Sequence, residues 1–168
     1  EFRRVLFRSS LTLGSLIVEP FSVSHDAADP IGINVFAGNN KATIVTDTGV
    51  ISDNILRRID DTTLLVLEAN YDPHMLRFGP YQSFLKQRVA SDEGHLSNEM
   101  AAQALLMMKR PDFMQVILAH RSENNNNAVL VTQTIGKMLV DGGVRIGPEM
   151  KLQHGQPNEI VSIQSVER

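Results

Sequence analysis

Cysteine and tryptophan are both absent from the 168-residue chain, and tyrosine occurs only twice. The lack of cysteine excludes disulfides, thiolate zinc sites and cysteine nucleophiles together. With so few aromatic rings, stacking on nucleic-acid bases is not expected to be the main mode of binding. No apolar run approaches the roughly 18 residues that a membrane helix needs, and no signal peptide is visible. We therefore expect a cytoplasmic protein with no membrane contact.

A large net charge is also missing, because the formal charge is −3 at pH 7. A slightly acidic chain argues mildly against broad electrostatic binding to nucleic acid. It leaves open a local basic stripe or a site whose charge comes from metal ions. The length, with 42% hydrophobic and 21% charged residues, fits one globular domain with a sizeable core.

The first nine residues, "EFRRVLFRS", resemble the conceptual translation of a common sequencing-adapter oligonucleotide. We expect residues 1–9 to be such an artefact and residues 10–168 to be a partial domain that lacks its N-terminal part. A genuine basic N-terminal strand is the alternative. If residues 1–9 are foreign, the remaining formal charge is −5, and the arginines among them are no DNA-binding arm.

The hydrophobic pattern predicts strands first and alternating helices and strands afterwards. The expected strands are 11–23 with Gly14 and Pro20 inside it, a hairpin of 32–37 and 42–46, then 63–69, 114–119 and an edge strand at 159–166. The expected helices are 53–59 capped by Ser52, two short pieces divided by Gly79-Pro80, 97–110 capped by Ser97, and 128–141. The order is typical of a layered α/β protein. The segment at 63–69, apolar without a break from Leu64 to Leu67, predicts a strand buried on both faces.

Four of the apolar strands are followed by, or end in, an ionisable residue: His25, Asp47, Glu68 and His120. Ligands of layered α/β proteins bind at the carboxyl ends of the central strands, where these four can meet. Imidazole and carboxylate without thiolate suit Zn²⁺, Mn²⁺ or Fe. Each residue also has an ordinary structural alternative: a hydrogen-bonded histidine, a turn aspartate or an ion-paired glutamate. Their shared position at strand ends favours a common metal site.

His95 lies just before the helix expected from Ser97. The positive end of a helix dipole opposes an imidazolium, so the ring can act as a proton donor or acceptor near neutral pH. A plain surface histidine is the alternative. His74 and His154 have no comparable setting, and we interpret both as surface residues.

Six strings occur in the order seen in metallo-β-lactamase-fold hydrolases, and the chain resembles the YycJ/WalJ-like group among them. The strings are "VSHDAADPIG", "TDTG", "LEANYDPHML", "YQSFLKQRV", "GHLSNEMAA" and "LAHRSENN". The resemblance extends from about Leu11 to the C-terminus. It implies the C-terminal portion of a four-layer αββα sandwich, an α/β fold that holds two divalent metal ions, Zn or Mn.

The resemblance also implies roles for individual residues. His25, Asp47 and His120 match metal ligands of the family, with Asp47 as the residue that bridges the two metals. Glu68 and His95 match the pair that, in the related tRNA-processing nucleases, assists proton transfer to the leaving group. These matches agree with the strand-end pattern, which was found without them.

Two departures from the family pattern matter. The family's His-x-His-x-Asp-His string, expected upstream of these motifs, does not occur in the 168 residues, and Tyr71 stands where close relatives often have histidine. With three metal ligands left, we expect this fragment to hold at most one weakly bound ion and to be inactive. A missing half of the sandwich would also expose an apolar sheet face and cause aggregation.

For the intact protein, the resemblance implies a metal-dependent phosphodiesterase that acts as a 5′-to-3′ exonuclease on double-stranded DNA. In such enzymes two cations roughly 3.5–4 Å apart activate water and stabilise phosphoryl charge. Candidate phosphate contacts are Arg57, Arg58, Lys86 and Arg88, although a solvated helix face explains them equally well. The alternatives are a metallo-hydrolase of a small ester, thioester or lactam, and a non-catalytic binding domain. The oligomeric state stays open.

Overall fold

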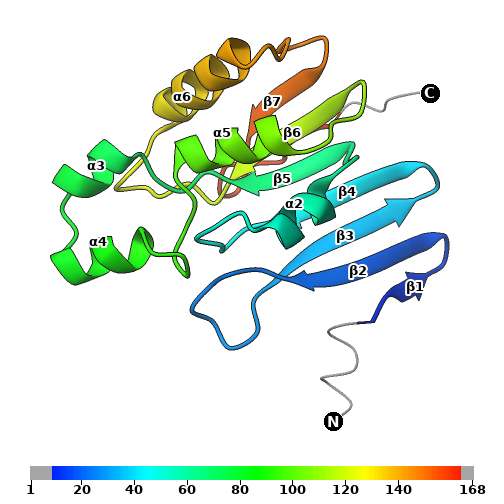
Figure 1. Cartoon of the computed structure of the whole chain (residues 1–168), viewed down its shortest axis with the longest axis horizontal. Helices are drawn as coiled ribbons and strands as arrows, with labels where there is room; N and C mark the ends of the chain where they lie inside the picture. Colours follow the sequence, from blue (N-terminus) through cyan, green and yellow to red (C-terminus); the bar gives the residue numbers. More distant parts are fainter. Residues whose placement is uncertain (1–8, 164–168) are drawn as a thin grey trace.

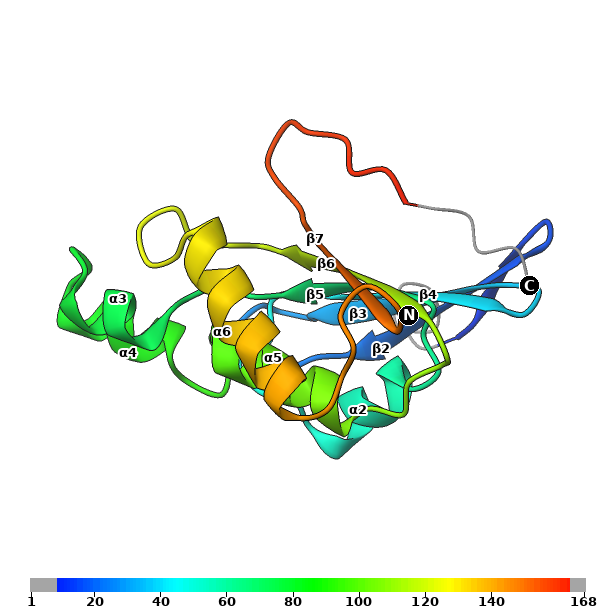
Figure 2. The same cartoon turned by 90° about the horizontal axis from the view of Figure 1, so that it is seen from above.

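A computed structural model describes residues 9–163. Of the leader expected at residues 1–9, only residue 9 lies within this range. Of the strand expected at 159–166, residues 164–166 lie outside it. Figures 1 and 2 show one mixed sheet with its helices on one face. None of the described helices is both long and apolar enough to cross a membrane.

The described strands form a single sheet in which spatial order follows chain order. They are β1 (Leu11–Leu13), β2 (Leu16–Ser22), β3 (Ile31–Ala37), β4 (Asn40–Val45), β5 (Leu64–Glu68), β6 (Met114–Ala119) and β7 (Met150–His154). Strands β1 to β4 pair antiparallel, whereas β4 to β7 pair parallel. Three parallel strands therefore bring their carboxyl ends to the same sheet edge as β4.

Helices follow or connect the parallel strands. They are α2 (Asp53–Ile59), α3 (Pro73–Phe78), α4 (Ser83–Val89), α5 (Asn98–Met107) and α6 (Ala128–Asp141). Ser52 and Ser97 are N-caps as predicted, since each side chain accepts a backbone N–H three residues later. The predicted range of α6 and the division between α3 and α4 are also confirmed.

Several predicted elements differ from the structure. The 11–23 run is split into a hairpin, because Gly14 adopts φ +60° and turns the chain between β1 and β2. Helix α5 ends at Met107, before Lys109 and Arg110, although Arg110 Nη1 still donates to the carbonyls of Leu105 and Leu106. Residues 159–163 form no strand, and the last strand is β7 instead.

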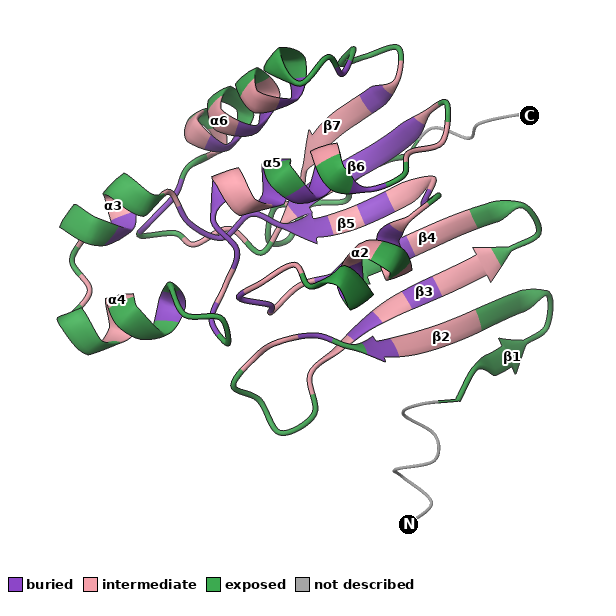
Figure 3. Cartoon of the chain, in the orientation of Figure 1, coloured by how far each residue is buried: buried purple, intermediate pink, exposed green. Residues whose placement is uncertain are grey.

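The core lies between the sheet and helices α2, α5 and α6 (Figure 3). On β5, Leu65 and Leu67 point into this core and are fully buried. Alternate side chains of a strand point to opposite faces, so Leu64 and Val66 face the other side, where they are only half-buried. The prediction that this strand is buried on both faces is therefore wrong for the described residues.

The helix-free face carries a row of apolar side chains across four neighbouring strands. Register pairs Ile33 with Ile44, Ile44 with Val66, and Val66 with Ile117. Ile44 is 41% exposed, and the other three are half-buried. Such a row is a surface that favours association with another apolar surface.

We expect Leu65→Ala to lower the free energy of unfolding by about 2–5 kcal/mol, since it leaves a cavity in the covered core. Leu64→Ala, the matched control on the same strand, removes the same atoms from the half-buried face and should cost less than half as much. Urea denaturation of both variants measures the difference. Equal losses would mean that the two faces of β5 are equally covered.

Candidate metal centre

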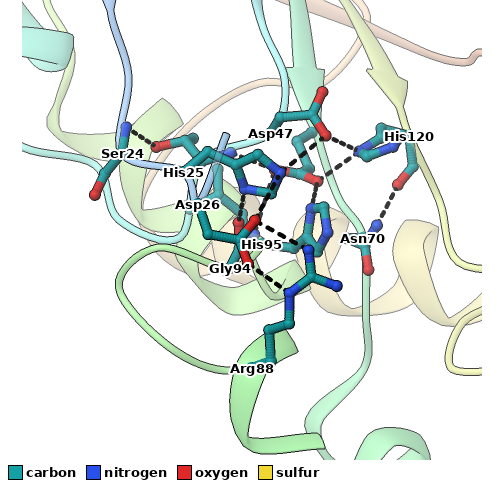
Figure 4. A network of polar contacts seen from close by, with 12 residues as sticks. Ser24, His25, Asp26, Asp47, Asn70, Arg88, Gly94, His95 and His120 are labelled. Atoms are coloured by element: carbon teal, nitrogen blue, oxygen red, sulfur yellow. Dashed lines mark hydrogen bonds and ion pairs between the residues drawn. The ribbon is translucent and has the colours of Figure 1, made fainter. Parts of the chain in front are cut away.

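The candidate site lies at the carboxyl edge of the parallel strands, beside α4. Asp47 follows β4, Glu68 ends β5 and His120 follows β6, while His25 comes from the loop after β2 and His95 from the loop before α5. Figure 4 shows the side chains of His25, Asp47, His95 and His120 pointing toward one another. A cavity of about 480 Å³ is lined by four of them, whereas Glu68 is fully buried beneath it.

His25 is oriented by a backbone carbonyl. Its Nδ1–H donates a hydrogen bond to the Gly94 carbonyl oxygen, at 3.0 Å. That bond leaves the lone pair of Nε2 available as a ligand, and Nε2 lies 3.7 Å from Asp47 Oδ1. Only glycine fits at position 94, because a Cβ there would lie 2.2 Å from the Arg88 carbonyl oxygen.

The loop that carries His25 is bound to α4 by an ion pair between Asp26 and Arg88. Arg88 donates to both carboxylate oxygens of Asp26, at 2.5 Å from Nε and 3.0 Å from Nη2, and the Asp26 backbone N–H donates to the Glu93 carbonyl. The hydrogen bond from Arg88 lowers the pKa of Asp26. Arg88 was predicted as a phosphate contact, and it does line the cavity. Its guanidinium, however, is already paired with the Asp26 carboxylate.

Asp47 lies between two imidazoles. Its Oδ1 is 3.7 Å from both His25 Nε2 and His120 Nδ1. The residue has φ +56°, a left-handed conformation that aspartate tolerates better than most side chains. This turn ends β4 and directs the carboxylate toward the cavity.

Glu68 connects two histidines from below. Its Oε1 accepts from His95 Nδ1 and His120 Nδ1, each at 2.7 Å, and its Oε2 accepts from the Thr48 and Leu96 backbone N–H groups at 3.1 and 3.5 Å. Burial raises the pKa of Glu68, but the hydrogen bonds from His120 and His95 outweigh it and the net pKa is lowered. Glu68 is therefore an ionised carboxylate at the base of the site, where it accepts four hydrogen bonds.

His120 is held at both its backbone and its ring. It adopts φ +53°, and its carbonyl accepts from Asn70 Nδ2 at 2.7 Å. The hydrogen bond to Glu68 raises the pKa of His120 above 6.5, against the opposing effect of burial. In the metal-free chain His120 thus binds its proton more tightly when folded than when unfolded.

This shift predicts a pH-dependent contribution of His120 to stability in EDTA. Because the folded pKa is raised, the contribution is complete below pH 6.5 and is lost as pH rises through the folded pKa. The difference in Tm between the wild type and His120→Gln should shrink as the pH rises above 6.5. His74→Gln, on α3, controls for loss of an imidazole. A difference that grows with pH would contradict the shift.

The donor chemistry fits a divalent metal. His25, Asp47 and His95 form one group whose ligand atoms all lie within 4.8 Å of one another, and Glu68, His95 and His120 form a second. Nitrogen and carboxylate oxygen donors without sulfur suit Zn²⁺ or Mn²⁺. Because Glu68 already accepts four hydrogen bonds, it fits a role in orienting the histidines better than one as a ligand.

Three of the predicted phosphate contacts are not brought to this cavity. Arg57 and Arg58 lie on α2, and Arg58 pairs with Glu19 at 3.4 Å. Lys86 Nζ donates to the Arg77 carbonyl. None of these three residues lines the cavity that contains the candidate metal ligands.

Sequence reasoning missed several groups that build the site. The Gly94 carbonyl, the Thr48 N–H and Asn70 act through contacts between distant segments, and no local pattern predicts such pairs. Arg121 also lines the cavity. Its position directly after His120 was the signal that could have identified it. Tyr71 is 6% exposed and packs with Leu76 outside the cavity lining.

Comparison with known proteins yields sequence relatives and structural neighbours. Exodeoxyribonuclease YycJ of Bacillus anthracis is 36% identical over 155 residues, which cover 92% of this chain and 59% of the relative. Exodeoxyribonuclease WalJ of Streptococcus pneumoniae is 33% identical over 147 residues, covering 88% and 55%. The chain thus spans somewhat more than half the length of these relatives. No family model matches the chain.

The crystal structure of the metallo-β-lactamase fold protein YhfI from Bacillus subtilis superposes with a TM-score of 0.62. The match has 12% sequence identity and covers 89% of this chain and 51% of that one. The chain therefore has the metallo-β-lactamase fold, of which the described residues form one sheet and one helix layer. By sequence it is a homologue of YycJ and WalJ, as its motifs predict.

Proposed function

We propose that the intact protein is a metal-dependent hydrolase of nucleic acid, acting as a 5′-to-3′ exonuclease on double-stranded DNA. The observation that carries the proposal is the convergence of His25, Asp47 and His120 on one cavity whose base is the Glu68–His95 pair. The printed names of the relatives, exodeoxyribonucleases at 36% and 33% identity, support the same activity.

His25, Asp47 and His120 would hold divalent metal, Zn or Mn, in the intact protein together with ligands beyond these three. Two such ions, when bound, would supply an activated water and stabilise negative charge on phosphoryl oxygens. The protein's part is to fix the donors before substrate arrives. Gly94 orients His25, and Glu68 and Asn70 orient His120.

His95 is the group that can deliver a proton to the departing oxygen. Its Nδ1 is held by the buried carboxylate of Glu68, so Nε2 is the nitrogen that remains for substrate. The ionised carboxylate stabilises the imidazolium that donates the proton. Proton transfer by a positioned group is worth about 10²–10⁴-fold in rate.

A metallo-hydrolase of a small ester, thioester or lactam is the second candidate. It is favoured by the acidic charge of −3 and by the positions of Arg57, Arg58 and Lys86 away from the cavity. The two candidates differ in salt dependence. A DNA hydrolase should lose affinity steeply with salt, with a slope of about −0.9 per phosphate contacted, whereas a small-ester hydrolase should not.

The test compares the intact protein with the 168-residue chain on a 3′-labelled DNA duplex, with and without Mn²⁺. The intact protein should shorten the labelled strand from its 5′ end, stop in EDTA and recover when Mn²⁺ is restored. The chain alone should show no turnover and bind at most one ion loosely, as measured by metal analysis after dialysis. Two tightly bound metals per chain, or an intact protein inactive on DNA but active on a small ester, would contradict the proposal.

A further inference from the structure

We propose that Arg121 and the cavity beside it form the phosphate-binding subsite of this hydrolase, which holds the nucleotide next to the scissile bond. The inference deepens the proposed function and rests on it. Arg121 directly follows His120, just after the carboxyl end of β6. Arg121 is not one of the four phosphate contacts predicted from the sequence, which are Arg57, Arg58, Lys86 and Arg88.

Arg121 lies in a wall shared by two cavities. The first is the cavity of about 480 Å³ that contains the candidate metal ligands, and the second, of about 600 Å³, lies on the other side of His120. His120, Arg121 and Glu123 line both. A chain of nucleotides that places one phosphate in the first cavity and its neighbour in the second must pass Arg121.

The guanidinium of Arg121 has unused hydrogen-bonding capacity. Its Nη1 is buried and has no partner among the described residues. A guanidinium keeps its positive charge throughout the pH range in which proteins are stable, so Nη1 always remains a hydrogen-bond donor. Arg88, the other arginine that lines the metal cavity, already donates to Asp26. Arg121 is therefore the arginine of this wall with a donor left for a ligand.

The surroundings favour an anion. The planar guanidinium matches two phosphate oxygens at once. Asn127 and Ala128, at the N-terminus of the 14-residue helix α6, line the second cavity and add the positive end of a helix dipole. Glu123 is the opposing charge, but its side chain is exposed and therefore screened by solvent.

The size of the second cavity matches the proposed ligand. Its volume of about 600 Å³ falls within the range of roughly 300–1,000 Å³ that small-molecule sites occupy. Gly155 and Pro157 form its far wall from the segment after β7. This is room for one nucleotide rather than for a duplex, which fits an enzyme that acts at a strand end.

The first experiment titrates the 168-residue chain with thymidine 5′-monophosphate and with inorganic phosphate, followed by ³¹P line broadening. Arg121→Gln should weaken binding of both by about 10- to 100-fold, the effect of one charged hydrogen-bonding partner. Arg121→Lys should restore part of it, because it keeps the charge but loses the fork. Arg57→Gln, at an exposed position of α2 that lines neither cavity, should bind as the wild type does.

The second experiment measures the intact protein on duplex DNA. Arg121→Gln should raise KM at least tenfold with kcat changed by less than about threefold, and should reduce the salt slope of DNA binding by about 1. Unfolding curves of all variants check that the fold is kept, and Arg121→Lys serves where the glutamine variant unfolds. Both arms have Arg57→Gln as the control.

The two proposals fail differently. If the intact wild type neither binds nor cleaves DNA while Arg121→Gln still abolishes phosphate binding, the nuclease proposal is wrong and the anion site stands. If the wild type cleaves DNA and Arg121→Gln equals Arg57→Gln in both experiments, the assignment of Arg121 is overturned and the nuclease proposal stands.

Discussion

Replacing Asp47 with asparagine is expected to reduce DNA cleavage by the intact protein about a thousandfold or more. Asp47 is the carboxylate between His25 and His120, with Oδ1 3.7 Å from a ring nitrogen of each. Removing its charge weakens the hold on metal, whose transition-state contribution is worth several kcal/mol, and each 1.36 kcal/mol is about tenfold in rate. Asparagine has the same size and tolerates the left-handed backbone at φ +56°. The variant therefore isolates the charge.

Asp61→Asn is the matched control for this prediction. Asp61 is another aspartate with φ +56°, but its side chain pairs with Lys109 at 3.0 Å and lies outside the candidate site. The control should keep full activity. Steady-state kcat on a labelled duplex and bound metal per chain are the two measurements. Activity of Asp47→Asn within tenfold of the wild type would contradict a role of the Asp47 carboxylate in holding the metal.

The parts of the site that the sequence could predict are those set by local structure. Asp47, Glu68 and His120 follow or end short apolar strands, and parallel strands bring such positions to one edge. Capping works in the same way, because Ser52 and Ser97 bond to backbone groups three residues away. Such features depend on the order of neighbouring residues and so are visible without a structure.

The parts that the sequence could not predict depend on contacts between distant segments. Strand β7 has the polar sequence "MKLQH" and becomes a strand because β6 provides a partner. The alternating run after Glu159 has no such partner as far as residue 163. Arg88 resembles a free surface cation in the sequence, yet it pairs with Asp26, 62 residues earlier. Pairing energy of this kind leaves no periodic pattern.

Glu68→Gln is expected to lower kcat of the intact protein by about 10²–10⁴-fold, the range for loss of positioned proton transfer. The carboxylate of Glu68 accepts from His95, His120 and two backbone N–H groups. A glutamine has one oxygen and one NH₂ group, so it must present a donor either to the two imidazoles or to the backbone. It therefore cannot orient both rings and also stabilise a charged His95.

The same substitution should lower the free energy of unfolding by about 1–3 kcal/mol, because a buried donor is left without an acceptor. Glu149→Gln is its control, since that carboxylate pairs with Arg145 at 2.5 Å and lines a different cavity. If Glu68 acts through His95, kcat should fall while KM changes little. Urea denaturation separates this effect from unfolding. A Glu68→Gln protein that is destabilised but cleaves DNA within about threefold of the wild type would assign Glu68 to the architecture of the site and leave the proton to another group.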